Sequence, residues 1–181
     1  METSLRSTVL DIKEKMFRAM KPFVLTLYEL ALELPEGTDV LEVGVRQYQS
    51  TRALISALVD KGSGTLTSID IKDWPSRLKE GQDRHRFIVS DSHQESTYDL
   101  VSDKKYGMLL IDGDHSYEGA RQDWELYSEL VSPGGFVIFH DVLNFDCGVP
   151  KLWDEVKEFC RRGNNEYLTI PAWPGLGIYR V

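Results

Sequence analysis

Residues 109–118 of the chain read LLIDGDHSYE, an apolar run that turns abruptly into acids and a histidine. This pattern is typical of a buried strand that ends at a site, because ligands of open parallel sheets bind beyond the carboxyl ends of the strands. A second stretch of the same form, GFVIFHD, occupies residues 135–141. The interval between Asp112 and His140 leaves room for one helix and one returning strand, so we expect the two strand ends to lie side by side.

Outward from these two strands, apolar runs and helical patterns alternate along the chain. Strands are expected at 40–43, 65–69, 87–89 and 108–111 and after the turn at 133–135, with helices at 50–60, 118–130 and 149–161. The last two strands, 167–170 and 176–181, are joined too closely for anything but an antiparallel hairpin. The pattern predicts an α/β fold: a Rossmann-like, doubly wound sheet of about seven strands, mostly parallel with an antiparallel C-terminal hairpin.

The N-terminal residues 4–34 are expected to form two helices ahead of this sheet. The second carries apolar residues at helical spacing, namely Phe23, Leu27, Leu30, Ala31 and Leu34. We therefore expect residues 1–36 to form a cap or partner surface, through which the chain can form a homo-oligomer, and residues 37–181 to form the main domain.

Composition narrows the class of partner. With 181 residues the chain has room for one sizeable core and little else. Its net charge of −8 argues against nucleic acid or an anionic membrane as partner, so a small molecule is expected. Two cysteines do not make a disulfide framework, and neither a signal peptide nor a long apolar run is visible, so the expected compartment is the cytoplasm.

Three short motifs, each at a predicted strand end, resemble those of class I S-adenosylmethionine-dependent methyltransferases. They are VLEVGVR at 40–46 followed by Ser50, SID at 68–70 and VSD at 89–91. Each alone is common by chance, and the resemblance rests on their order. It implies that Glu42 accepts from the cofactor's ammonium, that Gly44 lets the backbone approach, that Asp70 binds the ribose hydroxyls, and that the 89–91 segment meets the adenine amino group. The implied S-adenosylmethionine site comprises Glu42, Gly44, Ser50, Asp70, Ser90, Asp91 and Asp112.

A narrower resemblance covers about residues 38–145. The run IDGDHSYEG at 111–119, with PGG at 133–135 and FHDV at 139–142, resembles the family that includes the macrocin and mycinamicin sugar O-methyltransferases. In relatives that use a metal, the ligands follow strands four and five, which implies Asp112, His140 and Asp141 here. The same resemblance makes His115 the candidate general base, and a hydroxyl of a sugar, phenol or natural product the acceptor.

The residue types suit this chemistry. Methyl transfer to an alcohol needs the hydroxyl in line with the sulfonium methyl and a group that removes its proton. A divalent metal such as magnesium or manganese can hold the hydroxyl and lower its pKa, and a histidine can then take the proton. A nitrogen ligand such as His140 suits manganese, iron or zinc better than magnesium. The alternative is that His140 and Asp141 bond to backbone or to each other beside a metal-free pocket.

One departure and three other classes stay open. Tyr48 stands where the family usually has a second glycine, and a bulky side chain there can crowd the methionine end of the cofactor. If this crowding prevents cofactor binding, the chain is a protein with a methyltransferase fold but no catalytic turnover, which serves as a binding or assembly subunit. A glycosyltransferase would use Asp112 and Asp114 to hold manganese, and a nicotinamide dehydrogenase is disfavoured because the Gly-x-Gly-x-x-Gly fingerprint is absent.

The remaining histidines and tryptophans are expected to be structural. His85 and His93 lie in a charged approach to a strand and in a loop, and Trp74, Trp124 and Trp153 are expected to pack. Trp173, in the loop of the last hairpin, is the exception, as a candidate floor for a sugar or aromatic acceptor.

Overall fold

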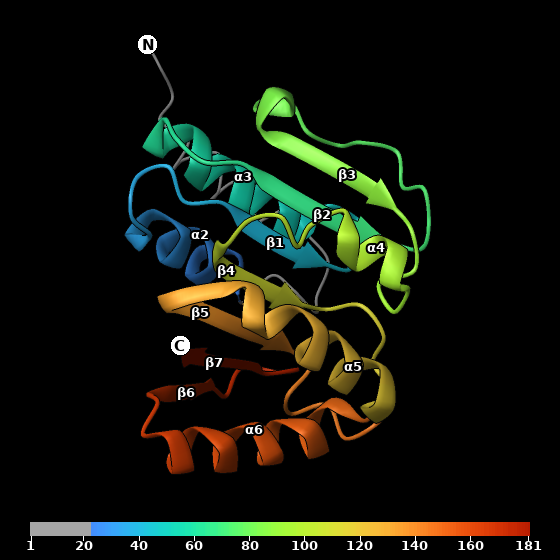
Figure 1. The fold of residues 1–181 in the computed structure, drawn as a ribbon, viewed down its shortest axis with the longest axis vertical. Coiled ribbons are helices and arrows are strands. Elements are labelled where there is room, and N and C mark those ends of the chain that lie inside the picture. Colours follow the sequence, from blue (N-terminus) through green and yellow to red (C-terminus); the bar gives the residue numbers. More distant parts are fainter. Residues whose placement is uncertain (1–22) are drawn as a thin grey trace.

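A seven-stranded sheet in the order β3-β2-β1-β4-β5-β7-β6 organises the computed structural model, which describes residues 23–181 (Figure 1). The strands are β1 (Val40–Val43), β2 (Leu66–Asp70), β3 (His85–Val89), β4 (Tyr106–Ile111), β5 (Val131–His140), β6 (Tyr167–Ile170) and β7 (Leu176–Arg180). Neighbouring strands from β3 to β5 pair in parallel, and β7 pairs antiparallel with both β5 and β6. The predicted sheet and its C-terminal hairpin are confirmed.

The register brings the carboxyl ends of the central strands level. Val43 of β1 lies opposite Ile111 of β4, which lies opposite Phe139 of β5. The loops that follow these three strands therefore leave the sheet side by side, as expected for the segments after residues 111 and 139.

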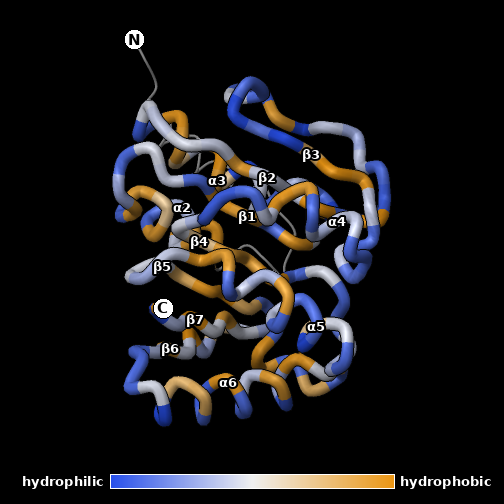
Figure 2. The backbone as a smooth tube through the Cα atoms, viewed as in Figure 1, coloured by the Kyte–Doolittle hydropathy of each residue, from blue (hydrophilic) through white to orange (hydrophobic). Residues whose placement is uncertain are grey.

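Helices cover both faces of the sheet. One face packs against α2 (Val24–Glu33) and α3 (Gln49–Lys61), and the other against α4 (Glu95–Asp99), α5 (Tyr117–Tyr127) and α6 (Val149–Gly163). Single 3₁₀ turns are η1 (Gln82–Arg84) and η2 (Ser128–Leu130). Every residue of β1 and β4 is buried, as a strand covered on both faces requires. In Figure 2 much of these central strands has the orange of hydrophobic residues, the residue type that suits buried positions.

Helix α2 is part of the same core as the sheet. Its side chains Val24, Leu27 and Ala31 are fully buried in one cluster with β1, α3 and β4. The predicted second N-terminal helix is thus confirmed, and its apolar face is covered by the rest of the chain. The first predicted helix falls within residues 1–22, outside the described residues, so the domain boundary at residue 36 and an oligomer contact stay predictions.

No helix between residues 23 and 181 combines the length and the apolar character needed to cross a bilayer. The cytoplasmic localisation stays a prediction.

Candidate active site

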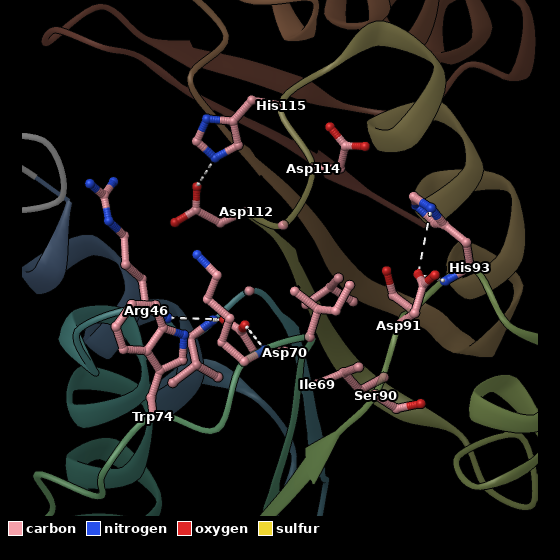
Figure 3. Close-up of a pocket in the computed structure, with 17 residues that line it drawn as sticks. Arg46, Ile69, Asp70, Trp74, Ser90, Asp91, His93, Asp112, Asp114 and His115 are labelled. Atoms are coloured by element: carbon pink, nitrogen blue, oxygen red, sulfur yellow. Dashed lines mark hydrogen bonds and ion pairs between the residues drawn. The ribbon is translucent and has the colours of Figure 1, made fainter.

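A cavity of about 720 Å³ opens at the carboxyl ends of β1 to β4 (Figure 3). Its size is typical of a small-molecule or cofactor site. Residues 43–46, 69–72, 90–93 and 112–115 line it together with Trp74. Among the predicted site residues it therefore brings together Gly44, Asp70, Ser90, Asp91, Asp112 and His115.

Gly44 marks the point where the loops after β1 and β4 approach most closely. Its φ is +93°, and a Cβ there would lie 2.1 Å from the backbone oxygen of Asp112. Both the left-handed conformation and the contact exclude a side chain. Gly44 therefore allows the loops after β1 and β4 to pack against each other at the pocket, and its approach to a cofactor stays a prediction.

Asp70, at the end of β2, ties the loop after β1 to the pocket. Its Oδ2 accepts the backbone N–H groups of Val45 (2.8 Å) and Arg46 (3.2 Å), and its Oδ1 accepts that of Lys72 (2.8 Å). A carboxylate has about four acceptor positions, two on each oxygen, so Oδ2 is fully used and Oδ1 keeps one position for a hydroxyl of a ligand.

Ser90 and Asp91 follow β3 and shape the far end of the pocket. Ser90 Oγ lies 2.6 Å from Thr97 Oγ1, and Asp91 Oδ1 accepts the backbone N–H of His93 at 3.0 Å. That N–H lowers the pKa of Asp91, so its carboxylate stays ionised. His93 also lines the pocket, with its Nε2 3.3 Å from the buried Asp123.

Glu42 and Ser50 lie outside the pocket lining, which differs from the expected contact with the cofactor's ammonium. Glu42 points to the same face of the sheet as Val40, where α3 begins, and it is fully buried. Its carboxylate accepts the hydroxyls of Ser50 (2.5 Å), Thr51 (2.8 Å) and Ser68 (2.7 Å). Burial nevertheless raises the pKa of Glu42 to about 7. In this structure Glu42 anchors the start of α3 beneath the loop that lines the pocket.

Tyr48 does not crowd the pocket. It adopts the left-handed φ of 61° that a glycine would take, and its side chain is 1% exposed. The ring packs edge-on against His85 and Phe87 of β3, at centroid distances of 5.8 and 6.1 Å. The expected crowding is wrong because the backbone directs the side chain away from the cavity.

Two carboxylates and two imidazoles converge beyond β4 and β5. His115 Nε2 lies 3.3 Å from Asp112 Oδ1, and its Nδ1 lies 3.1 Å from Asp141 Oδ2. His140 Nδ1 lies 3.0 Å from Asp112 Oδ1 and 3.3 Å from Asp141 Oδ2. The two strand ends are therefore side by side, as the sequence predicts.

The carboxylates and imidazoles of this cluster determine one another's protonation states. Burial alone would raise the pKa of Asp112, but the His140 and His115 imidazoles outweigh it and lower the pKa to about 2. Burial alone would likewise lower the pKa of His140, but Asp112 and Asp141 raise it to about 10. The hydrogen bond to Asp112 raises the pKa of His115. The cluster thus favours carboxylates paired with imidazolium groups.

Three side chains place possible metal-ligand atoms within 4.8 Å of one another: Asp112, His115 and Asp141. This set contains two of the three predicted ligands together with His115. The third predicted ligand, His140, is buried and packs edge-on against Phe23, with its Nδ1 within 3.3 Å of both carboxylates, so its role as a ligand stays a prediction. Two oxygens and one nitrogen suit manganese, iron or zinc better than magnesium.

Asp114 takes a different direction from Asp112 (Figure 3). Its Oδ1 accepts the backbone N–H of Ser116 at 2.8 Å, at the start of α5. The pair of acids that a glycosyltransferase would need is therefore split between the metal-like cluster and a helix start.

A family model described as a methyltransferase domain matches residues 41–142, more than half of the chain. The chain belongs to this methyltransferase family. The match spans the carboxyl ends of β1 to β5 and the residues that follow them, which supply every described group of the pocket and the cluster beside it.

Solved structures share the fold of this methyltransferase. MycE from the mycinamycin biosynthetic pathway, in complex with Mg, SAH and mycinamycin VI, has a TM-score of 0.69 at 16% identity, over 97% of this chain and 52% of that chain. SAH-bound PaMTH1 of Podospora anserina has a TM-score of 0.65 at 12% identity, over 99% and 88% of the two chains. "Uncharacterized protein R132" of Acanthamoeba polyphaga mimivirus is 32% identical over 56 residues, 30% of the methyltransferase and 25% of that protein. The methyltransferase thus spans about a quarter of the length of the curated relative it matches.

Among the lining residues that were not predicted as part of a site are Arg46, Lys72, Trp74 and His93. Each lies only a few positions beyond the carboxyl end of β1, β2 or β3, and this position is the signal that could have found them. Trp153 is buried, which confirms its expected packing. Trp173 is 61% exposed and lies outside the lining of this cavity, so its role toward an acceptor stays a prediction.

Proposed function

We propose that the chain is an S-adenosylmethionine-dependent O-methyltransferase that acts on a hydroxyl of a small molecule, such as a sugar, a phenol or a natural product. The observation that carries the proposal is the continuity of one cavity from the acids after β2 and β3 to Asp112 and His115 after β4. Such a cavity can hold a cofactor at one end and present its reactive group to an acceptor at the other.

The residues of the cavity fit the cofactor. Asp70 keeps one acceptor position, on Oδ1, for a ribose hydroxyl, and Ser90 and Asp91 lie where an adenine amino group can donate. Gly44 and Asp112 both line the cavity at this point, where the sulfur-bearing chain would lie. When bound, the cofactor supplies the methyl group as a sulfonium.

His115 is the proposed general base. It lies at the acceptor end, and Asp112 and Asp141 hold its ring from both sides. Only the neutral ring can act as a base, and Asp112 raises the pKa of His115, so the imidazolium must first lose its proton. The neutral ring then takes the proton of the acceptor hydroxyl as the new bond forms, and the two carboxylates stabilise the imidazolium that results.

The proposal further includes a divalent metal at the acceptor end of the site. Asp112 and Asp141 would hold it together with His115, or with His140 as the resemblance implies, and its chemistry would be to polarise the acceptor hydroxyl. A nitrogen that binds a metal cannot accept a proton, so the two roles of His115 exclude each other. Turnover measured with EDTA, magnesium or manganese tests the metal: full activity in EDTA excludes the ligand role and supports the base, whereas strict metal dependence requires a metal held with His115 or with His140.

The first test is calorimetric titration with S-adenosylmethionine and S-adenosylhomocysteine, each with and without manganese or magnesium. Micromolar affinity is the expected result and justifies a screen of hydroxylated acceptors. Absence of binding under every condition would contradict the proposal and favour a non-catalytic binding or assembly subunit.

His115→Ala tests the base. We expect turnover to fall about a hundredfold or more, because general-base catalysis contributes at least that much, while the affinity for S-adenosylhomocysteine changes little. Cofactor affinity, measured on the same preparation, is the control for folding. Unchanged turnover would remove His115 from the mechanism.

A further inference from the structure

Two cationic side chains line the pocket without an anionic partner. Arg46 and Lys72 both belong to the lining, yet in the part of the chain from residue 23 onward neither lies within 4.0 Å of a carboxylate oxygen in an ion pair. Lys72 lies over the ring of Trp74 at 5.8 Å. Arg46 is exposed, and a guanidinium at the edge of a cavity can bind an anion, because its planar donors match a carboxylate in pairs.

The acids of the same cavity are engaged elsewhere. Each of the four takes a hydrogen bond or ion pair from a neighbour other than these two side chains: Asp70 from the backbone of residues 45, 46 and 72, Asp91 from His93, Asp112 from His115 and His140, and Asp114 from Ser116. Backbone amides, rather than cationic side chains, satisfy Asp70. The positive charge of Arg46 is therefore available to a ligand.

The backbone at Arg46 gives a second reason to assign a role to its side chain. Its φ is +43°, in the left-handed region that favours glycine or asparagine, and Asp70 holds it there by accepting its N–H. Arginine is a poor choice for this conformation on backbone grounds alone. In the view of Figure 3 the side chain runs from beside Trp74 to the left of Asp112, and its guanidinium points away from Asp70 and Asp91.

The position along the sheet identifies which part of a ligand meets Arg46. The strand order β3-β2-β1-β4 places Asp91, Asp70, the Arg46 loop and Asp112 in sequence along one edge. If adenine lies at β3 and ribose at β2, the amino-acid end of the cofactor lies at β1. The α-carboxylate is the one anionic group of S-adenosylmethionine, whose sulfonium and ammonium are positive and whose adenosyl part is neutral.

We infer that the Arg46 guanidinium binds the α-carboxylate of the S-adenosyl cofactor, with the Lys72 ammonium adding positive charge beside it. The inference rests on the proposed function and names the group that selects the amino-acid end of its cofactor. An anionic acceptor would offer the same chemistry, so the test must separate a carboxylate on the cofactor from one on the acceptor.

The experiment compares two ligands and two proteins by calorimetry, with no acceptor present. The ligands are S-adenosylhomocysteine and its decarboxylated analogue, which keeps the adenosine, the sulfur, the chain and the ammonium. The proteins are the full chain and Arg46→Gln. We expect the variant to bind S-adenosylhomocysteine at least about tenfold more weakly and the analogue with unchanged affinity, because a charged hydrogen-bonded pair contributes that much. Arg46→Lys, which keeps the charge and loses the paired donors, should fall between the two.

Arg77→Gln is the matched control, because Arg77 is exposed and lies outside the lining. It should leave both affinities unchanged. Equal weakening of both ligands by Arg46→Gln would show that Arg46 supports the loop rather than the carboxylate, and would overturn the inference. Unchanged affinity for both would also overturn it and would assign the guanidinium to the acceptor side. Failure of the unaltered chain to bind either ligand is a distinct outcome, which would overturn the proposed function itself.

Discussion

The carboxyl group of Glu42 makes the stability of the fold depend on pH. Its pKa of about 7 in the folded chain exceeds the ordinary value of 4.5, because burial disfavours the charged form. Between these two pH values the unfolded chain loses a proton that the folded chain keeps, so the free energy of unfolding falls as pH rises and levels off above pH 7. The full difference is about 3 kcal/mol, at 1.36 kcal/mol per pKa unit.

Glu42→Gln should remove this contribution, because glutamine keeps the shape and does not ionise. Urea unfolding at several pH values from 4.5 to 8 measures it, as the difference between the variant and the unaltered chain. The exposed Glu33→Gln is the control and should leave the pH dependence unchanged. A Glu42→Gln difference that stays constant with pH would show that Glu42 does not titrate in this range.

For single residues, the sequence predicted where a residue lies in the fold better than the direction in which its side chain points. Asp70, Asp91 and Asp112 line the pocket because the residue after a parallel strand necessarily lies at the sheet edge. Glu42 lies within its strand, where alternation turns the side chain toward one face of the sheet. The direction of Tyr48 depends on a left-handed backbone angle, which residue type alone does not predict for tyrosine.

At the scale of elements, the close approach of the loops after β1 and β4 is the feature on which the pocket depends. Gly44→Ala would place a Cβ 2.1 Å from the Asp112 backbone oxygen, so one of the two loops would have to move. Gly134→Ala is the matched control, because its φ is +83° and no atom lies within 4 Å of its added Cβ. The control should lower the free energy of unfolding only by the left-handed strain of about 1 kcal/mol.

We expect Gly44→Ala to lower the free energy of unfolding, measured in urea, by more than this. It should also weaken S-adenosylhomocysteine binding at least about tenfold, a loss that the control should not show. Equal effects of the two substitutions would mean that the close approach is not required.

The elements themselves were predictable where burial decides them. Strands β1, β4 and β5 appear in the sequence as short apolar runs because both faces of the sheet are covered. Helix α4 has only five residues, too few for a helical period to show, and it was not predicted. The choice between His115 and His140 as a convergent ligand depends on the direction of the loop before α5 and on packing against Phe23, which is contact between distant segments.

At the scale of the whole molecule, the shared core of α2 and the sheet predicts one cooperative unit rather than a cap that unfolds separately. Leu27 of α2 is fully buried in the cluster that contains β1, α3 and β4, whereas Leu32 on the same helix is 37% exposed. Leu27→Ala should lower the free energy of unfolding of the whole chain by about 2–5 kcal/mol, the usual cost of a buried leucine, and Leu32→Ala by no more than about 0.5 kcal/mol. Circular dichroism and tryptophan fluorescence, followed together through a thermal transition, should report a single lowered midpoint for Leu27→Ala. Two separate transitions would instead support a boundary near residue 36, and would show that α2 can detach while the sheet and its pocket stay folded.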